Sequence, residues 1–186
     1  MNKIKKQGWQ IPFTDWSTDV TIVFTDGSEK SHKAGAGVAI KDNYTNTWKL
    51  YSWRTQGEQS IERAEWEAVA GALRLTEHEP RVRIIADRES MVNSIREQHY
   101  TGKHKDLKRV VKHYSQMNQN TREIMWVKSH IQIEGNEEAD IMANQGREAS
   151  ERPKLEVTQP GRVWSIEGTE LSSSSSQWHK SPPMDW

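Results

Sequence analysis

The stretch Val20-Thr-Ile-Val-Phe-Thr-Asp26-Gly27 combines β-branched and aromatic residues with a turn signal, so it predicts a strand that ends at Asp26. Two more β-rich runs follow at 34–40 and 47–53, after short connections. Strands joined in this way form an antiparallel meander. The meander decides the fold class, because the rest of the chain alternates between helix and strand patterns.

The later segments complete an α/β arrangement. Apolar residues recur at helical spacing from Ala64 to Leu75, and Ser60 is placed to cap that helix. The remaining segments predict a strand at 82–86, helices at 89–97 and 103–117, a strand at 124–127, and a last helix capped by Asn136 and ending near Ala149. The order β-β-β-α-β-α-α-β-α predicts a mixed sheet with helices on its faces.

The ends of the chain differ in character from its centre. Residues 1–18 have no clear period and predict an irregular lead-in, whereas 19–149 carry the folded domain. Residues 150–186 contain prolines at 153, 160, 182 and 183 and consecutive serines from Ser172 to Ser176. This composition predicts a disordered tail.

Composition excludes several classes of protein. The chain contains no cysteine, which rules out a disulfide scaffold and a thiolate metal site. No apolar run approaches the ~20 residues of a membrane span, and no signal core follows the basic N-terminus. We therefore expect a soluble, intracellular protein. Basic and acidic residues balance at 26 each, which leaves nucleic-acid binding open.

Three acids stand where a site could form. Asp26 and Asp87 each follow a predicted strand, and Asp140 lies early in the last helix. Acids that end neighbouring parallel strands lie only ~5 Å apart, and their repulsion favours a bound cation. Carboxylate ligands suit Mg²⁺ or Mn²⁺, and two such ions ~4 Å apart support in-line phosphoryl displacement. Taken singly, each acid could instead be a turn former or a helix cap.

Four short motifs give this pattern a more specific meaning. They are Phe24-Thr-Asp26-Gly-Ser28, Arg63-Ala-Glu65, Ala86-Asp87 with Ser90, and Ser129-His130 leading to Gly135-Asn-Glu-Glu-Ala-Asp140. In this order they resemble the motifs of the ribonuclease H family. The resemblance is to type 1-like members, above all the ribonuclease H domains of reverse-transcribing elements, and it spans about residues 20–147.

The resemblance implies a fold, an activity and a set of ligands. The family has a five-stranded mixed sheet, with three antiparallel strands and two more parallel to the first. Its members cut the RNA strand of RNA–DNA hybrids with two Mg²⁺ ions, or Mn²⁺, and leave 5′-phosphate and 3′-hydroxyl ends. Asp26 would bridge both ions, Glu65 and Asp87 would complete one site, and Asp140 the other. His130 would help to move a proton or release product.

Substrate contacts follow from the same resemblance. Gly27 and Ser28 are expected to meet ribose, and Ser60 to grip a DNA phosphate, although Ser60 could be only a helix cap. The basic helix at 103–117 is either a phosphate contact or a solvated face. We expect Glu67, and the histidines other than His130, to face solvent.

Other readings of the motifs remain open. The chain could be part of a reverse-transcribing polyprotein or derived from one. A related nuclease acting on DNA, and a non-catalytic, nucleic-acid-binding connection domain, are the alternative functions. The His130 loop and the Arg63-Ala-Glu65 motif argue against the first alternative, and the presence of all four acids argues against the second.

Overall fold

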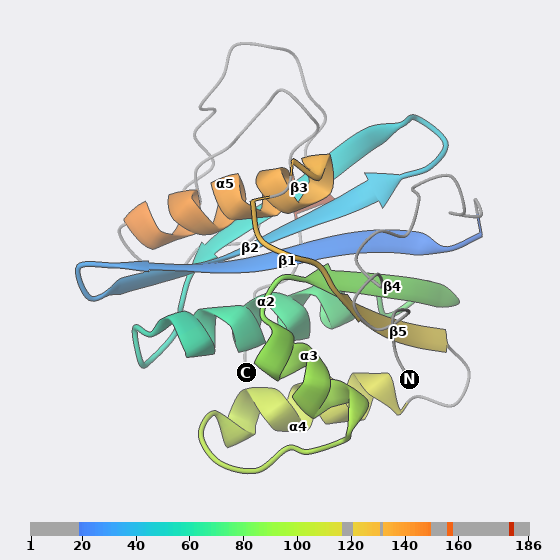
Figure 1. Cartoon of the computed structure of the whole chain (residues 1–186). Helices are drawn as coiled ribbons and strands as arrows, with labels where there is room; N and C mark the ends of the chain where they lie inside the picture. The colour runs from blue at the N-terminus through green and yellow to red at the C-terminus, as the bar shows by residue number, and fades with distance from the viewer. Residues whose placement is uncertain (1–18, 117–120, 131, 150–155, 158–178, 181–186) are drawn as a thin grey trace.

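The computed structural model describes residues 19–116, 121–130, 132–149, 156–157 and 179–180, and a five-stranded mixed sheet forms its centre (Figure 1). Strands β1, β2 and β3 pair antiparallel, β4 pairs parallel to β1, and β5 pairs parallel to β4. Their bounds are β1 Thr21–Lys30, β2 Lys33–Asp42, β3 Thr47–Arg54, β4 Arg81–Ala86 and β5 Thr121–Trp126, and their order is β3-β2-β1-β4-β5. The predicted α/β fold with three antiparallel and two parallel strands is confirmed.

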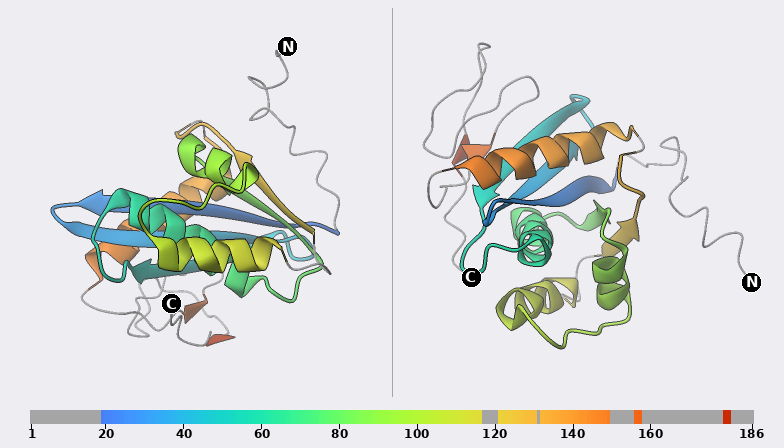
Figure 2. Two further views of the ribbon diagram at one scale, coloured as in Figure 1. Left: turned by 90° about the horizontal axis from the view of Figure 1, so that it is seen from below. Right: turned by 60° about the vertical axis from the view of Figure 1, so that its left-hand side comes forward.

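Helices cover both faces of this sheet. Figures 1 and 2 show α5 alone on one face, with α2, α3 and α4 on the other. The bounds are α2 Ile61–Leu75, α3 Glu89–Arg96, α4 Lys105–Ser115 and α5 Glu134–Glu148. Each face buries its own apolar cluster, one around Phe24, Trp48 and Met142 beneath α5, the other around Trp66 and Leu73. The order of elements is the predicted one.

The first strand is longer than the sequence predicts. It continues through Asp26 to Lys30, and the chain turns at Ser31 and His32, whose φ angles are 53° and 60°. The reason is that antiparallel pairing with β2 continues past Asp26, which lies opposite Gly37. The prediction that the strand ends at Asp26 is wrong. However, the parallel pairing with β4 does stop one residue earlier, at Thr25.

Close packing of α5 against β2 depends on glycine. A Cβ atom at Gly37 would lie 2.1 Å from the backbone oxygen of Ala139 and 2.4 Å from the backbone nitrogen of Ala143. No side chain fits in that space. The helix therefore lies directly on the strand, and Ala139, Met142 and Ala143 are buried.

Helix starts were predicted with mixed success. Ser60 caps α2, and its side chain accepts a hydrogen bond from the backbone N–H of Arg63 at 3.3 Å. The predicted cap at Asn136 is wrong, because α5 begins at Glu134 and Asn136 is buried within its first turn. The helix starts earlier because Ile133 is buried against the apolar cluster under α5 and occupies the cap position.

Two polar side chains that were expected at the surface are buried. Glu67 is fully buried, where it accepts hydrogen bonds from Trp53 Nε1 at 3.2 Å and the Gln56 N–H at 2.9 Å. The side chain of His104, at the start of α4, is only 3% exposed. Both predictions are wrong for the same reason. Helix α2 packs against the sheet and also against α4, so Glu67 on α2 and His104 at the start of α4 are both covered.

The predicted lead-in, 1–18, and most of the predicted tail, 150–186, lie outside the described residues. Within the tail, two short strands, β6 Glu156–Val157 and β7 His179–Lys180, pair antiparallel. The predicted domain boundaries stay predictions. None of the helices in the described ranges combines the length and apolar character that a membrane crossing needs.

Candidate metal centre

Three carboxylates from different elements meet at the end of β4. Asp26 comes from β1, Glu65 from α2, and Asp87 from the residue that follows β4. One oxygen atom of each lies within 4.8 Å of the others. Asp26 and Glu65 are buried, 6% and 4% exposed, and Asp87 is partly exposed. The site is therefore mostly buried, and Asp87 is its most exposed member.

Strand register brings Asp26 and Asp87 together. Thr25 pairs with Ala86 in the parallel ladder, so the residues that follow them start side by side, about 5 Å apart in backbone. The Trp126 Nε1–H donates to the Asp87 backbone oxygen at 2.9 Å. This hydrogen bond holds the backbone of Asp87 in place between the end of β4 and the start of α3.

Gly27 allows Glu65 to reach Asp26. A Cβ atom at Gly27 would lie only 2.7 Å from the backbone nitrogen of Glu65. The start of α2 can therefore lie directly against β1, which sets Glu65 beside Asp26. The Gly27 N–H also donates to Asp26 Oδ1 at 2.9 Å, which helps to orient that carboxylate.

Asp140 approaches the group from the opposite face of the sheet. It lies on α5 and is not one of the three acids of the group, but its carboxylate is close enough to that of Asp26 to raise the pKa of Asp26. Asp26 thus stands between Asp140 on one side and Glu65 and Asp87 on the other. Asp26 and these three neighbours are the four acids predicted from the sequence.

The electrostatics of the group call for a cation. Burial raises the pKa of Asp26 far above its usual range, and the neighbouring Glu65, Asp87 and Asp140 raise it further. Burial and Asp87 likewise raise the pKa of Glu65. Glu65 Oε2 is buried and, among the described residues, has no hydrogen-bond partner. Oxygen ligands in such a group fit a hard divalent cation, which would neutralise their repulsion.

His130 lies in the loop between β5 and α5. It is exposed and has a φ of 56°, a left-handed conformation that is uncommon for residues other than glycine. Gln132 in the same loop has a φ of 60°. His130 is not a member of the three-carboxylate group. Its predicted helper role remains a prediction.

The predicted substrate contacts have structural partners of their own. The Ser28 hydroxyl donates to Asn144 Oδ1 at 2.7 Å and accepts from Arg147 Nη1 at 2.5 Å. Ser60 caps α2, and Gly27 lies between Asp26 and α2. Sequence reasoning did not single out Asn144 or Arg147, because Ser28, their shared partner, lies on a distant part of the chain.

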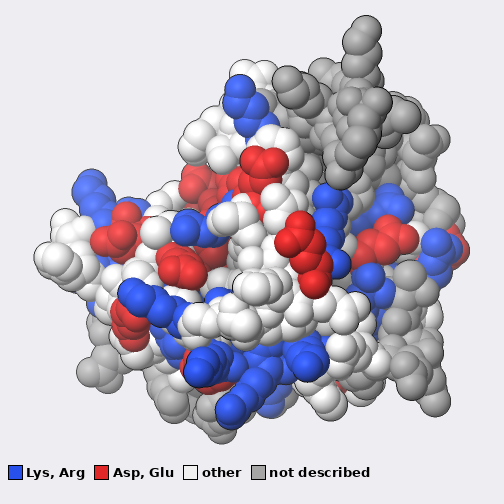
Figure 3. All heavy atoms as spheres, turned by 60° about the horizontal axis from the view of Figure 1, so that its bottom comes forward, with Lys and Arg blue, Asp and Glu red and all other residues white. Residues whose placement is uncertain are grey.

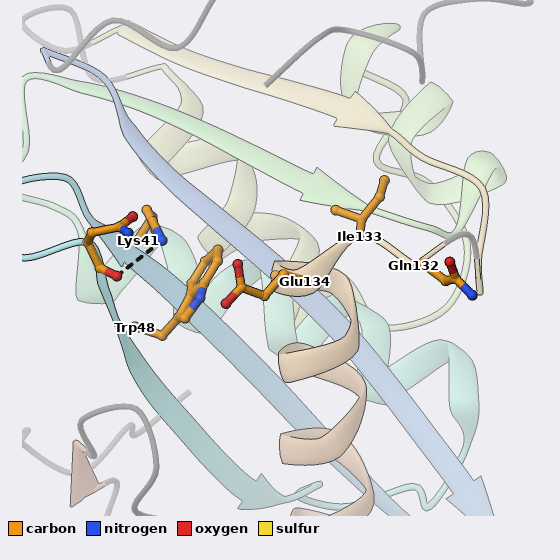
Figure 4. Close-up of a pocket in the computed structure, with 7 residues that line it drawn as sticks. Lys41, Trp48, Gln132, Ile133 and Glu134 are labelled. Atoms are coloured by element: carbon orange, nitrogen blue, oxygen red, sulfur yellow. Dashed lines mark hydrogen bonds between the residues drawn. The ribbon is translucent and has the colours of Figure 1, made fainter. Parts of the chain in front are cut away.

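A separate pocket lies beside the first turn of α5 (Figure 4). Its volume is about 390 Å³, and none of the four acids lines it. The lining residues are Lys41, Asn46, Trp48, Gln132, Ile133, Glu134 and Gly135. Lys41 Nζ stands 4.6 Å from the centre of the Trp48 ring. The pocket therefore borders the His130 loop but is distinct from the carboxylate site.

The fold and the site together define an α/β protein with a group of carboxylates that could hold a divalent cation. A family profile described as RNase H matches residues 18–148. The chain belongs to the RNase H family, a family of nucleases. A search of curated proteins finds no match.

Solved structures resemble the same region. The chain is similar to LC11-RNase H1, isolated from compost by a metagenomic approach, with 24% identity and a TM-score of 0.57 over 69% of this chain and 96% of that one. It is similar to a foamy viral protease-reverse transcriptase, with 20% identity and a TM-score of 0.60 over 72% of this chain and 21% of that one. RNase H1 of the archaeon Halobacterium salinarum matches at 16% identity, with a TM-score of 0.55 over 68% of this chain and 96% of that one.

Proposed function

We propose that this chain is an endoribonuclease that hydrolyses the RNA strand of RNA–DNA hybrids. The observation that carries the proposal is the grouping of Asp26, Glu65 and Asp87, whose oxygens lie within 4.8 Å of one another, with Asp140 close to Asp26. Membership of the RNase H family supports the same conclusion. The products would carry 5′-phosphate and 3′-hydroxyl ends.

The four acids would hold two Mg²⁺ ions, or Mn²⁺. When bound, such ions activate the attacking water and stabilise the leaving oxygen. Asp26 would be the ligand common to both ions, because Glu65, Asp87 and Asp140 all lie near it. Glu65 and Asp87 would hold one ion with Asp26, and Asp140 would hold the other. Gly27 and Trp126 act on this set only by positioning Glu65 and Asp87.

His130 is suited to moving a proton near the site. A histidine ring has two nitrogens that can accept and return a proton. It stands in a loop at the end of β5, which is the parallel neighbour of β4. Because the carboxylates carry the main charge stabilisation, replacing His130 by alanine should slow turnover without abolishing it.

The hybrid substrate is supported by relatives and by charge. One structure of LC11-RNase H1 and one of the foamy viral protein are complexes with RNA/DNA hybrid, and another structure of the foamy viral protein is a complex with dsDNA. In Figure 3, Lys and Arg side chains gather low on the face that carries α4. The exposed members on or next to this helix are Lys103, Lys105, Arg109 and Lys112, which we call the α4 basic face. A face of this kind can follow a phosphate backbone.

Further contacts belong to the same proposal. Gly27 and Ser28 would meet ribose, and Ser60 a DNA phosphate, in addition to their structural partners. The similarity to a foamy viral protein supports the view that the chain acts within, or is derived from, a reverse-transcribing polyprotein.

The test is cleavage of labelled hybrid, duplex RNA and duplex DNA with Mg²⁺ and with a chelator. We expect cuts confined to the RNA strand of the hybrid, lost on chelation, with ends that direct mapping identifies. Asp87→Asn should abolish cutting while the fold is kept, whereas Glu89→Gln, a nearby exposed acid, should not. Cutting of duplex DNA would favour a DNA nuclease. Hybrid binding without cutting would favour a connection domain.

A further inference from the structure

A second polar group continues the contact between β1 and α5 beyond the acids. Asp26 and Ser28 project from the same face of β1, because alternate residues of a strand share a face. Asp140 and Asn144 are one helical turn apart on α5. Asp26 lies close to Asp140, and Ser28 donates to Asn144 Oδ1 at 2.7 Å. The strand and the helix therefore meet first through an acidic pair and then through a neutral polar pair.

Arg147 adds a positive charge to this second pair. Its Nη1 donates to Ser28 Oγ at 2.5 Å and to Asn144 Oδ1 at 2.8 Å. Its Nε donates to Glu148 Oε1 at 2.9 Å. The side chain is 15% exposed, and Nη2 has no hydrogen-bond partner among the described residues. The guanidinium is thus held in place through two of its nitrogens while the third is available.

The surroundings of Arg147 are rich in positive charge. The hydrogen bond from Arg147 holds the pKa of Glu148 below its usual range, and Lys33 and Lys30 contribute to the same effect. Both lysines are exposed, at the turn that joins β1 to β2. Glu148 is itself exposed and is held by a single side-chain bond, so an anion could displace it from Arg147.

We propose that Arg147 binds a phosphate of the strand that is cut, one or two nucleotides from the phosphate at the carboxylates. Ser28 and Asn144 are then positioning residues for its guanidinium. Ser28 lies about 7 Å along β1 from Asp26, and successive phosphates of one strand rise about 3.4 Å along a duplex. The planar guanidinium matches the geometry of a phosphate. This inference rests on the proposed function, since it takes the substrate to be a hybrid.

The first test separates binding from chemistry. Arg147→Gln should raise the KM for hybrid roughly tenfold and leave kcat nearly unchanged, as expected for the loss of one charged hydrogen bond. Arg147→Lys keeps the positive charge but lacks the paired donors of the planar guanidinium, so its KM should lie between those of the unmodified chain and Arg147→Gln. Arg74→Gln, on the last turn of α2, is the matched control and should leave KM unchanged. Glu148→Gln should lower KM, because it removes the negative charge that competes with a phosphate for the guanidinium.

The second test identifies the phosphate itself. Single phosphates of the RNA strand are replaced by neutral methylphosphonates, and hybrid affinity is measured with the Asp87→Asn chain, which separates binding from cutting. We expect that one methylphosphonate near the cut weakens binding when Arg147 is present. In a chain that also carries Arg147→Gln, the same methylphosphonate should weaken binding no further. If the loss of affinity from Arg147→Gln simply adds to the loss from the methylphosphonate at every position, the proposal is wrong. This test measures binding and not cleavage. A negative result would therefore contradict the role of Arg147 without contradicting hybrid cleavage by the unmodified chain.

Discussion

Gly27 shows how a single missing side chain can assemble a site. A Cβ atom at Gly27 would lie 2.7 Å from the Glu65 backbone nitrogen, a distance that real Cβ atoms essentially never show. Gly27→Ala should therefore push the start of α2 away from β1, at a cost of about 1–3 kcal/mol in unfolding free energy. Glu65 moves with the helix, so the metal group opens. Chemical denaturation and Mg²⁺ titration would measure both effects, and a variant with unchanged Mg²⁺ affinity would contradict this role.

The acids themselves should oppose folding when no cation is bound. Burial and mutual repulsion raise the pKa of Asp26 and Glu65, so the folded chain holds these protons more tightly than the unfolded chain. Their stabilising contribution is present below the unfolded pKa values, about 4, and is lost as pH rises through the higher folded values. Metal-free protein should thus lose stability from this group as pH rises.

Asp26→Asn tests this balance directly. Because Asn cannot ionise, the change removes the cost of burying the Asp26 carboxyl group, and it should raise the Tm of the metal-free protein at neutral pH. It should also abolish most of the Tm increase that Mg²⁺ gives to the unmodified chain. Glu89→Gln, an exposed acid outside the group, should change neither value. Calorimetry with and without Mg²⁺ measures the effect. A metal-free Asp26→Asn chain that melts earlier would argue against repulsion within the site.

Individual residues were predictable from sequence to different degrees. The four acids could be named because each stands in a short local motif, such as Arg63-Ala-Glu65. Arg147 and Asn144 could not, because their role depends on Ser28, more than a hundred positions away along the chain. Local patterns identify ligands, whereas contacts that cross the sheet must be seen in the fold.

Among the elements, α2 carries a buried polar network centred on Glu67. Glu67 accepts bonds from Trp53 Nε1 and the Gln56 N–H, and Arg63 Nε lies 3.3 Å from its carboxylate. Glu67→Gln replaces one acceptor by a donor and leaves a partner unsatisfied. We expect a loss of roughly 1–3 kcal/mol in unfolding free energy, measured by denaturation. Glu62→Gln, on the same helix but partly exposed, should cost far less, and equal losses would refute this account.

The order of elements was predictable because each has a clear period or a strong β composition. Their ends were less so. The Asp26-Gly27 turn signal is overridden by eight paired positions between β1 and β2, and the Asn136 cap is displaced by the burial of Ile133. In both cases tertiary contacts outweigh a local preference of about 1 kcal/mol.

On the scale of the molecule, charge is separated rather than balanced. The chain has equal numbers of acidic and basic residues, yet three acids lie close to Asp26 and the α4 basic face lies on another part of the surface. Lys108 is an exception on that helix, because it is buried, donates to the Thr101 oxygen at 2.6 Å and stacks on Trp66. Only the exposed basic residues are available to a phosphate backbone.

This separation predicts how binding should depend on salt. If Lys105, Arg109 and Lys112 each neutralise one phosphate, replacing all three by glutamine should reduce the slope of log affinity against log salt by roughly three. Cleavage at saturating hybrid should stay close to that of the unmodified chain, because the acids are untouched. Lys49→Gln, an exposed lysine on β3, is the control and should leave the slope unchanged. Titrations at several salt concentrations measure the slope. An unaltered slope in the triple variant would mean that the α4 basic face is merely solvated, and that the hybrid is held by other contacts.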